Sequence, residues 1–447
     1  MRWRNCFLLA VSYLFYFTWS LWAAAALAGA TLLAFFAGKW AEETKPRAKI
    51  TTLAAVMILI AYLFCFKIIA ILPNNDLAGL AMPLGVSYYT FRLISYVLDL
   101  HWGKIKPEQR LTAFAAYVAF FPQIVAGPIQ RAGDFLEQVP PPRAAALQGV
   151  PRIAWGFAKK MFVADQLAPA VNCVFAHVRG FHGPALMVGF YLYPLQLYVD
   201  FSALTDIAVG TGRLFGIQGP ENFDRPFTAS NIAAYWRRWH MSLTSWLTDY
   251  LFTPLRIATR EAGRVGLAFS ITINMIAIGI WHGLSWGYFV FGVVHAFYLN
   301  VDALTAKKRK SFFKAHHSLD SIGNWLGWLV TFHLVAAALV FFRARRVSDA
   351  IFLLSHLLSS LSDFGFELEQ LVSTTGAHAF AVGITGYALL ELAERFRPDQ
   401  RWMYVKAVSP RWVRWSVNSA VATLVFIGIL MLINEGGSKH PFLYAIY

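Results

Sequence analysis

One long stretch near the start of the chain carries no charge, and this constrains the fold more than any other feature. Residues 6–37 contain no Asp, Glu, Lys or Arg. A helix needs about 20 apolar residues to cross the hydrocarbon core of a bilayer. The run can therefore form one long tilted membrane helix or a tight pair of shorter ones. It is too long for a cleavable signal peptide, so we expect it to be retained.

The rest of the chain has the composition of a membrane protein. Of its residues, 57% are hydrophobic and 14% are charged, whereas soluble chains carry about 25% charged residues. We predict an all-α, polytopic integral membrane protein with roughly ten to twelve helices, forming a single membrane domain over residues 1–447. Membrane helices are predicted at 50–72, 111–127, 185–201, 265–283, 286–301, 325–342, 376–391 and 416–434. Shorter or amphipathic helices are predicted at 83–100, 153–177, 203–216 and 349–361.

The net charge of +15 points to membrane lipids as partners. Basic residues gather in segments that we place between helices, for example Lys159–Lys160 and Lys307 to Lys310. Such residues attract the anionic headgroups of the bilayer. No RNA- or DNA-binding motif accompanies them, so we expect no nucleic-acid partner.

The cysteines and histidines give no sign of a metal site. Cys6, Cys65 and Cys173 all lie in apolar runs, without metal-ligand spacing and without a disulfide framework. The paired His316–His317 lies in a basic segment with no acid or cysteine at ligand spacing. We therefore predict no metal and no bound cofactor.

The central part of the chain, residues 185–285, places polar residues inside stretches that would otherwise span the bilayer. Ionisable groups at membrane depth cost roughly 2.5–3.5 kcal/mol each, and they usually face a bundle interior or a wet cavity. This region is where we expect a site. Its candidate residues outside the stretch 234–255 are Asp200, Ser202, Asn274 and His282.

His282 lies among apolar neighbours in "GIWHGLSW". Gly279 and Gly283 are four residues apart on one helix face, which allows another element to approach the backbone closely. A histidine can take a proton from a hydroxyl and pass it on. The alternative is a buried histidine that only donates a hydrogen bond to a neighbouring helix.

The stretch "AYWRRWHMSLTSWLTDYLFTPL", residues 234–255, has the densest polar content. Its tryptophans and arginines could form an interfacial belt at headgroup level. That belt accounts less well for His240 and poorly for Asp249. If the stretch is one continuous helix, residues 236, 240 and 249 share a similar bearing and could line one groove. The arginine pair could then hold a phosphorylated acyl carrier or donor. Candidate binding residues here are Trp236, Arg237, Arg238 and Asp249.

Asp200 and Asp206 are six residues apart, so on one helix they point to different sides. A paired acid–base role is therefore not expected. We favour a structural role, with one of them pairing with Arg213, Arg225 or Arg237.

Several ordered motifs resemble the membrane-bound O-acyltransferase family, most closely its bacterial alginate O-acetyltransferase-like branch. They cover roughly residues 80–345, leaving 346–447 as C-terminal helices, and eight of them in order make the resemblance specific. The motifs are "MPLGVSYYTFRLISYVLDL" (82–100), "FFPQIVAGPIQR" (120–131), "GFAKKMFVADQLA" (156–168), "YPLQLYVDFSALTDIAVGTGRLFG" (193–216), "PENFDRPF" (220–227), "YWRRWHMSLTSWLTDYLFTPL" (235–255), "IWHG" (280–283) and "TFHLVAAALVFFRA" (331–344).

The resemblance implies a multi-helix fold around a central tunnel through a bacterial inner membrane. It implies transfer of an acyl group, with acetyl expected, from a cytoplasmic thioester such as acetyl-CoA to hydroxyls of an exopolysaccharide or cell-wall glycan. The transfer is direct or passes through a periplasmic acyltransferase or esterase-like partner. The family's near-invariant histidine corresponds to His282, as general base or as the residue that positions the transfer. The second polar position of this branch corresponds to His240, which would orient the acceptor or the acyl group.

The chain departs from the family pattern in two places. Thr248 stands where an arginine usually precedes the aspartate, and Arg256 stands where a glycine commonly follows. These departures leave the acceptor open, and D-alanyl transfer to teichoic acid is the alternative within the family. A transporter, or a scaffold without chemistry of its own, are the alternatives outside it.

Overall fold

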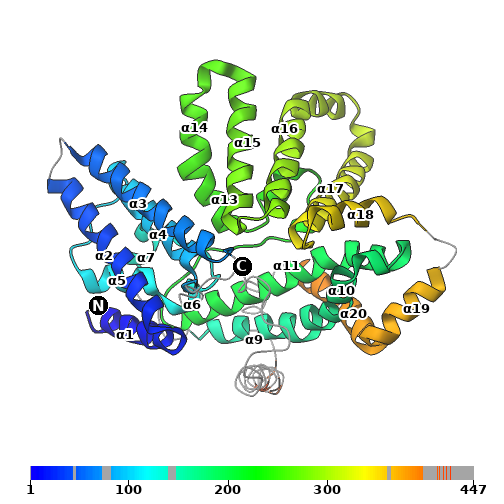
Figure 1. Cartoon of the computed structure of the whole chain (residues 1–447), viewed down its shortest axis with the longest axis horizontal. Coiled ribbons are helices and arrows are strands. Elements are labelled where there is room, and N and C mark those ends of the chain that lie inside the picture. The colour runs from blue at the N-terminus through cyan, green and yellow to red at the C-terminus, as the bar shows by residue number, and fades with distance from the viewer. Residues whose placement is uncertain are drawn as a thin grey trace. The chain divides into compact units, whose positions relative to one another are not determined.

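The computed structural model describes residues 2–43, 47–72, 82–138, 147–359 and 364–395, together with five single residues between 410 and 423. Every regular element in these ranges is helical, and they contain no strand (Figure 1). The longer helices are α1 Arg2–Trp19, α2 Leu21–Glu43, α3 Ala48–Ile69, α4 Val86–His101, α9 Gly149–Lys159, α10 Asp165–Ala176, α11 Gly183–Leu214, α15 Gly263–His282, α16 Trp286–Ala315, α17 Asp320–Arg343, α18 Val347–His356, α19 Phe364–Thr375 and α20 Ala377–Arg395.

Short elements connect them. They are the α-helices α5 Leu111–Ala119, α6 Phe121–Ile124, α7 Ala132–Leu136, α12 Ile232–Trp236, α13 Met241–Leu247 and α14 Thr253–Ala258, the 3₁₀ turns η4 Val178–Gly180, η5 Pro226–Thr228, η7 Arg260–Ala262 and η8 His317–Leu319, and the π-helical turns η3 Lys160–Ala164 and η6 Thr248–Phe252.

The uncharged run at the start forms a pair of helices, which is one of the two forms predicted for it. α1 ends at Trp19 and α2 begins at Leu21. The hydroxyl of Ser20 accepts a hydrogen bond from the backbone N–H of Ala23 at 3.3 Å. A serine at this position satisfies one of the free N–H groups of the new helix.

Five described helices are long and apolar enough to cross a membrane: Leu21–Glu42, Ala48–Ile69, Arg260–His282, Trp286–Ala315 and His317–Arg343. A bent pair, Gly365–Ser373 with Ala377–Arg395, makes up to six. The chain is thus an all-α, multi-pass membrane protein. The other helices predicted from apolar runs exist but are short, broken or rich in polar side chains. The helix predicted at 416–434 lies outside the ranges in which the structure describes continuous helices.

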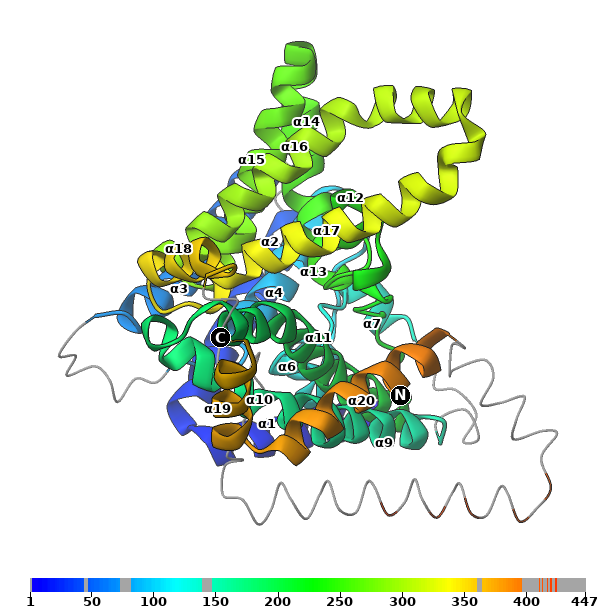
Figure 2. The same cartoon turned by 90° about the vertical axis from the view of Figure 1, so that its right-hand side faces the viewer.

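Three expected boundaries were wrong. The apolar run 111–127 is broken at Phe120, where α5 ends and α6 begins. The helices expected at 185–201 and 203–216 are one helix, α11, which runs through Pro194. Lys307 to Lys310, expected between helices, belong to α16 (Figure 2). α16 continues because Lys, Arg and Ala favour helix and no Gly or Pro interrupts them.

Contacts divide the chain into two compact units. Unit 1 contains residues 1–149, 208–221 and 245–251, and unit 2 contains 150–207, 222–244 and 252–447. In unit 1, α1 to α5 pack on one another, and in unit 2, α15, α16 and α17 pack as consecutive antiparallel helices (Figures 1 and 2). The single domain predicted from the sequence stays a prediction.

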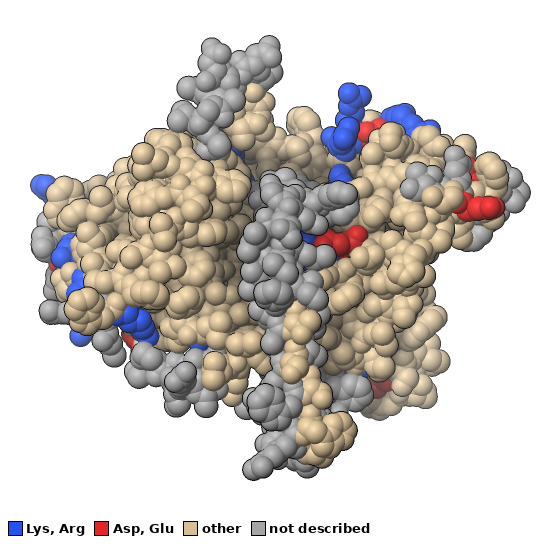
Figure 3. Space-filling view, turned by 90° about the horizontal axis from the view of Figure 1, so that it is seen from below, with Lys and Arg blue, Asp and Glu red and all other residues tan. Residues whose placement is uncertain are grey.

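Much of the exposed surface is apolar, as a lipid-facing surface must be. Figure 3 shows a face on which charged side chains are sparse among the described residues. Large exposed apolar side chains occur on several helices, for example Trp19, Trp40, Phe297 and Trp325. In a soluble chain so many exposed tryptophans would promote aggregation, whereas in a bilayer they contact lipid.

Candidate active site

His282 is the last residue of α15, and aromatic rings from three helices surround it. Its ring centroid lies 4.9 Å from that of Trp281, 4.9 Å from Phe342 of α17 and 6.2 Å from Tyr288 of α16. The side chain is buried. The helix ends here because the next residue, Gly283, takes an extended conformation that leaves the helical region.

The two glycines predicted to allow a close approach do so. A Cβ atom on Gly279 would lie 2.2 Å from the backbone oxygen of Tyr288, and one on Gly283 would lie 2.6 Å from the Tyr288 ring. Gly292 of α16 approaches Met275 of α15 in the same way, at 2.7 Å from its backbone oxygen. The small residues thus let α15 and α16 pack backbone to backbone beside His282.

His240 lies in a break between two short helices. α12 ends at Trp236 and α13 begins at Met241, and His240 has a positive φ of 45°. The continuous helix assumed for 234–255 was therefore wrong. A positive φ is uncommon for a residue other than glycine and costs on the order of 1–3 kcal/mol, so surrounding contacts must hold it.

The imidazole of His240 is 1% exposed and contacts three kinds of group. Its Nδ1 lies 3.1 Å from Oδ1 of Asn222. Phe201 of α11 packs edge-on against the ring at 4.8 Å between centroids, and Trp281 lies at 6.0 Å. Burial lowers the pKa of His240 from 6.5 to about 3, so the ring is neutral near pH 7.

The structure brings the two candidate histidines to one indole. Trp281 is the chain neighbour of His282 and also contacts His240, and all three residues belong to unit 2. A neutral imidazole is the form that can accept a proton. Both imidazoles are buried and lie against the same indole, so an acyl group and a hydroxyl bound between them would be shielded from bulk water.

The tryptophans of the 234–255 stretch are not an interfacial belt. Trp236 and Trp239 are 5% and 4% exposed. Trp239 packs against Tyr198, Phe223 and Tyr235 with ring centroids 5.2–6.4 Å apart. The belt hypothesis was therefore wrong for these two residues, which belong to the aromatic core of unit 2.

Trp236 leads to a third histidine, which the sequence analysis missed. The indole Nε1–H of Trp236 donates to Nδ1 of His295 at 3.3 Å, and His295 is fully buried in α16. Phe291 contacts both His295 and Phe342, and Phe342 in turn contacts His282. Two phenylalanine rings therefore separate His295 from His282. The position of His295 four residues after Phe291 in an apolar helix gave it the pattern of a core residue.

The two arginines of the stretch differ. Arg237 is exposed, whereas Arg238 is half-buried and donates from Nη1 to the hydroxyl of Thr228 at 2.6 Å. Of these two arginines, Arg237 is the one with an exposed guanidinium group. Asn274 lies on α15, two helical turns before His282, and its side-chain oxygen is buried without a hydrogen bond within the described part of the chain.

Asp200 and Ser202 belong to a buried cluster of charges in unit 2. Lys160 bonds Asp200 at 2.8 Å, and Lys159 bonds both Asp206 at 3.0 Å and Glu394 of α20 at 2.6 Å. Ser202 lies 3.4 Å from the same Lys159 ammonium. The predicted structural role of the aspartates fits these ion pairs, but the predicted partners were wrong. Arg213 pairs with Glu221 and Arg225 pairs with Glu391.

The ion pairs keep Lys159 charged although it is buried. Burial by itself would lower the pKa of Lys159, but the attraction of Asp206 and Glu394 outweighs it, and the pKa is raised above the ordinary value. Removing one partner from such a pair typically destabilises a fold by about 3–5 kcal/mol. The cluster therefore joins the junction between α9 and η3 to α11 and α20 within unit 2.

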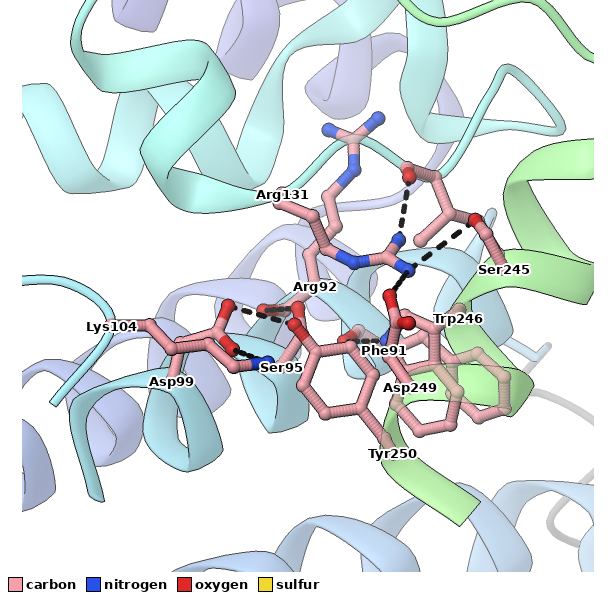
Figure 4. A network of polar contacts seen from close by, with 11 residues as sticks. Phe91, Arg92, Ser95, Asp99, Lys104, Arg131, Ser245, Trp246, Asp249 and Tyr250 are labelled. Atoms are coloured by element: carbon pink, nitrogen blue, oxygen red, sulfur yellow. Dashed lines mark hydrogen bonds and ion pairs between the residues drawn. The ribbon is translucent and has the colours of Figure 1, made fainter. Parts of the chain in front are cut away.

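Asp249 belongs to unit 1, together with a second polar network (Figure 4). Its carboxylate accepts from Nη2 of Arg131 at 3.2 Å, and the Arg131 guanidinium lies 5.2 Å from the centre of the Tyr250 ring. The Tyr250 hydroxyl donates to Asp99 at 2.7 Å. Asp249 is half exposed, so this pair contributes little stability and serves mainly to orient Arg131.

Asn222 is the second residue that the sequence analysis missed. It lies in the "PENFDRPF" motif, where the charged Glu221 and Asp224 are more prominent, and its partner His240 follows 18 residues later. The available signal was an asparagine inside a motif shortly before a candidate histidine. Trp281 was overlooked because a tryptophan in an apolar helix is indistinguishable from a core residue without its contacts.

Comparison with known proteins identifies the family of the chain. Residues 8–342 match the model of the membrane-bound O-acyltransferase family. The chain is 31% identical to the probable alginate O-acetylase of Pseudomonas putida, over 99% of this chain and 94% of the relative. It is 27% identical to the peptidoglycan O-acetyltransferase of Helicobacter pylori, over 77% of this chain and 72% of the relative.

A third relative is named for the transfer of a different acyl group. The teichoic acid D-alanyltransferase of Streptococcus thermophilus is 31% identical over 60% of this chain and 70% of the relative. The family match begins at residue 8 and therefore includes the first helices, which precede the motifs in residues 80–345. The chain therefore belongs to the membrane-bound O-acyltransferase family, and it is a multi-pass membrane O-acyltransferase.

Proposed function

We propose that the chain transfers an acetyl group from a cytoplasmic thioester, acetyl-CoA or a related donor, to hydroxyls of a polysaccharide outside the cytoplasm. The observation that carries the proposal is the pair of buried histidines, His240 and His282, on the indole of Trp281. An acyl transfer to a hydroxyl needs a base for the hydroxyl proton, and it needs water to be kept away from the thioester.

In this proposal His282 is the general base. Its imidazole removes the proton of the hydroxyl as the oxygen attacks the acyl carbon. A C–O bond forms, the C–S bond breaks, and the thiolate receives the proton. His282 lies at the C-terminal end of α15, where the partial negative charge of the helix stabilises the imidazolium formed during the reaction. General base catalysis contributes about 10²–10⁴-fold.

His240 orients the acceptor or the acyl group in the same proposal. Because its pKa is about 3, it stays neutral and offers a hydrogen bond and not a charge. Asn274 is a candidate for contact with the acyl group, since its buried side-chain oxygen makes no hydrogen bond within the described residues. Exposed Arg237 is a candidate for the phosphates of the donor.

Alginate is the first acceptor to test, because the relative matched over nearly its whole length is a probable alginate O-acetylase. A peptidoglycan acceptor is the second, because the Helicobacter pylori relative acts on that polymer by name. We further propose a location in the bacterial inner membrane and a periplasmic acyltransferase or esterase-like partner that receives the acetyl group on a serine.

D-alanyl transfer to teichoic acid is the alternative. The 31% identity to a teichoic acid D-alanyltransferase supports it, over a smaller share of the chain. Both reactions use a thioester and a hydroxyl, so His282 would have the same role in each. The acyl group distinguishes them, because a D-alanyl group carries a positively charged amine near pH 7 and an acetyl group does not.

Membrane vesicles containing the full-length chain would test the proposal. Vesicles are supplied with radiolabelled acetyl-CoA on the donor side and with de-acetylated alginate on the other, with and without the periplasmic partner, and ester-bound label is measured. We expect transfer by the wild type and a loss of 10²–10⁴-fold in His282→Ala. His317→Ala is the matched control, because His317 is exposed in the turn η8.

Two results would count against the proposal. Transfer by His282→Ala at the wild-type rate would remove the base role of His282. Ester formation only from a D-alanyl carrier, with none from acetyl-CoA in the presence of the partner, would replace acetyl transfer with the alternative.

A further inference from the structure

Asn222 is buried, and its side chain hydrogen-bonds to His240, Ser242 and Thr205. The residue is 0% exposed and lies in the loop between α11 and η5. Its side-chain oxygen Oδ1 lies 3.1 Å from Nδ1 of His240, 3.2 Å from the backbone nitrogen of Ser242 and 2.9 Å from the Ser242 hydroxyl. Its amide nitrogen donates to the hydroxyl of Thr205 at 3.4 Å.

The orientation of the Asn222 amide follows from these partners. A backbone N–H can only donate, so the atom that faces the nitrogen of Ser242 must be an acceptor. If the amide were turned over, its NH₂ group would face the N–H of Ser242, and two donors would meet in a buried place. The hydrogen-bond network therefore fixes Oδ1 toward Ser242 and toward His240.

The fixed amide decides the tautomer of the histidine. Because Oδ1 can only accept, the Nδ1 atom of His240 that faces it must carry the proton. His240 is neutral near pH 7, since burial holds its pKa at about 3. A neutral imidazole has one proton on its two nitrogens, so Nε2 carries the lone pair and is the acceptor.

The backbone around His240 is held by the same loop. The carbonyl of Asn222 accepts from the N–H of Met241 at 2.9 Å, and the N–H of Asp224 donates to the carbonyl of Arg238 at 3.0 Å. The carbonyl of His240 itself accepts from the N–H of Thr244, in the first turn of α13. These bonds satisfy the first N–H groups of α13 and hold His240 at its positive φ.

We propose that Asn222 is a positioning residue of the acyl-transfer site: it fixes His240 as the Nδ1-protonated tautomer, so that Nε2 is presented to the substrate as a hydrogen-bond acceptor. The assignment rests on the proposed function of His240 at the site. Asn222 acts through His240 and contacts no reacting atom. In this arrangement a second, non-reacting hydroxyl of the acceptor donates its hydrogen bond to Nε2, which orients the acceptor so that His282 can remove the proton of the reacting hydroxyl.

The tautomer is measured directly by nitrogen NMR on the full-length protein in lipid nanodiscs, with ¹⁵N-labelled histidine. The signals of His240 are identified as those that disappear in His240→Gln. We expect Nδ1 to resonate in the protonated range and Nε2 in the unprotonated range at pH 7. In Asn222→Leu, which has no acceptor, we expect this fixed state to be lost. In Asn222→Asp, which keeps an acceptor at the same place, we expect it to be retained.

Ser242→Ala is the matched control for a merely structural effect. It removes one hydroxyl that contacts Asn222 but leaves the Ser242 N–H and the His240 contact in place. We expect the wild-type tautomer in this variant. Asn222→Leu also loses a helix cap, so its fold is checked by thermal unfolding, and Asn222→Asp supplies a folded variant with the acceptor intact.

Transfer rates complete the test. We expect Asn222→Leu to lose on the order of 10²-fold in kcat, because an acceptor that is not held by His240 is misplaced relative to His282, and Asn222→Asp to recover most of it. A wild-type His240 protonated on Nε2, or an unchanged tautomer in Asn222→Leu, would overturn the inference. The NMR result does not depend on turnover. If instead transfer is unaffected by His240→Gln and by Asn222→Leu, the site role of His240 is wrong, whatever its tautomer.

Discussion

At the scale of single residues, the site depends on a few side chains that have several partners at once. Trp281 contacts both candidate histidines, and Asn222 binds His240 while capping α13. Substitutions at such positions are not additive, because one change alters several contacts. We therefore expect Trp281→Ala combined with either histidine substitution to lose less transfer activity than the two single losses together would give.

The buried, neutral state of His240 makes stability depend on pH. Its pKa is about 3 in the fold and about 6.5 in the unfolded chain, so between these values the unfolded chain binds a proton and the folded chain does not. The free energy of unfolding therefore falls as the pH is lowered from 6.5 toward 3, by about 1.4 kcal/mol per unit. Thermal unfolding of the wild type and of His240→Gln in detergent at pH 4 to 7 measures this.

His317→Gln provides the comparison for the pH experiment, because His317 is exposed. The wild type and this variant should lose melting temperature in parallel on acidification, whereas His240→Gln should lose less. Equal slopes for all three proteins would show that His240 takes up a proton as readily in the fold as in the unfolded chain.

At the scale of elements, the helices could largely be predicted from the sequence, but their breaks and partners could not. The uncharged run yields α1 and α2, and the glycine spacing correctly indicates the close approach at Gly279. The break at residues 237–240 was missed because helical periodicity continues through it, while its cause is a hydrogen-bonded loop from elsewhere in the chain. The ion pairs of Asp200 and Asp206 were assigned to arginines, whereas Lys159 and Lys160 were expected to attract lipid headgroups.

The close packing of α15 on α16 predicts a sensitive position beside His282. The Cβ atom of Gly279→Ala would lie 2.2 Å from the backbone oxygen of Tyr288, so the helices must separate. We expect a loss of about 1–3 kcal/mol in stability, as for other overpacked cores, and a reduced rate of transfer because His282 is displaced. Thermal unfolding and the vesicle assay measure the two effects.

Gly29→Ala in α2 is the control for this substitution. A Cβ atom there meets nothing within 4 Å, so only helix propensity changes, and alanine favours a helix by up to about 1 kcal/mol. Unchanged or raised stability is expected. If Gly279→Ala were as stable and as active as Gly29→Ala, the backbone contact between α15 and α16 would not be needed.

At the scale of the whole molecule, the length of α16 can be compared with the thickness of the bilayer, because His282 lies close to one end of this helix. It has 30 residues and is therefore about 45 Å long, longer than a hydrocarbon core of about 30 Å. Its first residue, Trp286, follows His282 closely, whereas Lys307 to Lys310 lie near its other end, about 32 Å further on. Basic residues beside a membrane helix favour the cytoplasmic side, so we expect this end to face the cytoplasm.

Cysteine labelling tests that orientation. Ser318 in the turn η8 and Ser285 before α16 are replaced by cysteine, one at a time, in a chain whose Cys6, Cys65 and Cys173 have been changed to serine. A thiol reagent that does not cross membranes should label Ser318→Cys only when the cytoplasmic side is open. Labelling of Ser318→Cys in intact cells would place the basic end outside.

The length of α16 has a consequence for the side of the membrane on which each substrate is used. If its basic end faces the cytoplasm, His282 lies near the opposite side of the hydrocarbon core, and the two substrates approach from different compartments. For the acetyl transfer that we propose, coenzyme A would then stay inside while the ester is made on the other side. A polymer outside the cytoplasm could in that case be acetylated without loss of coenzyme A from the cell.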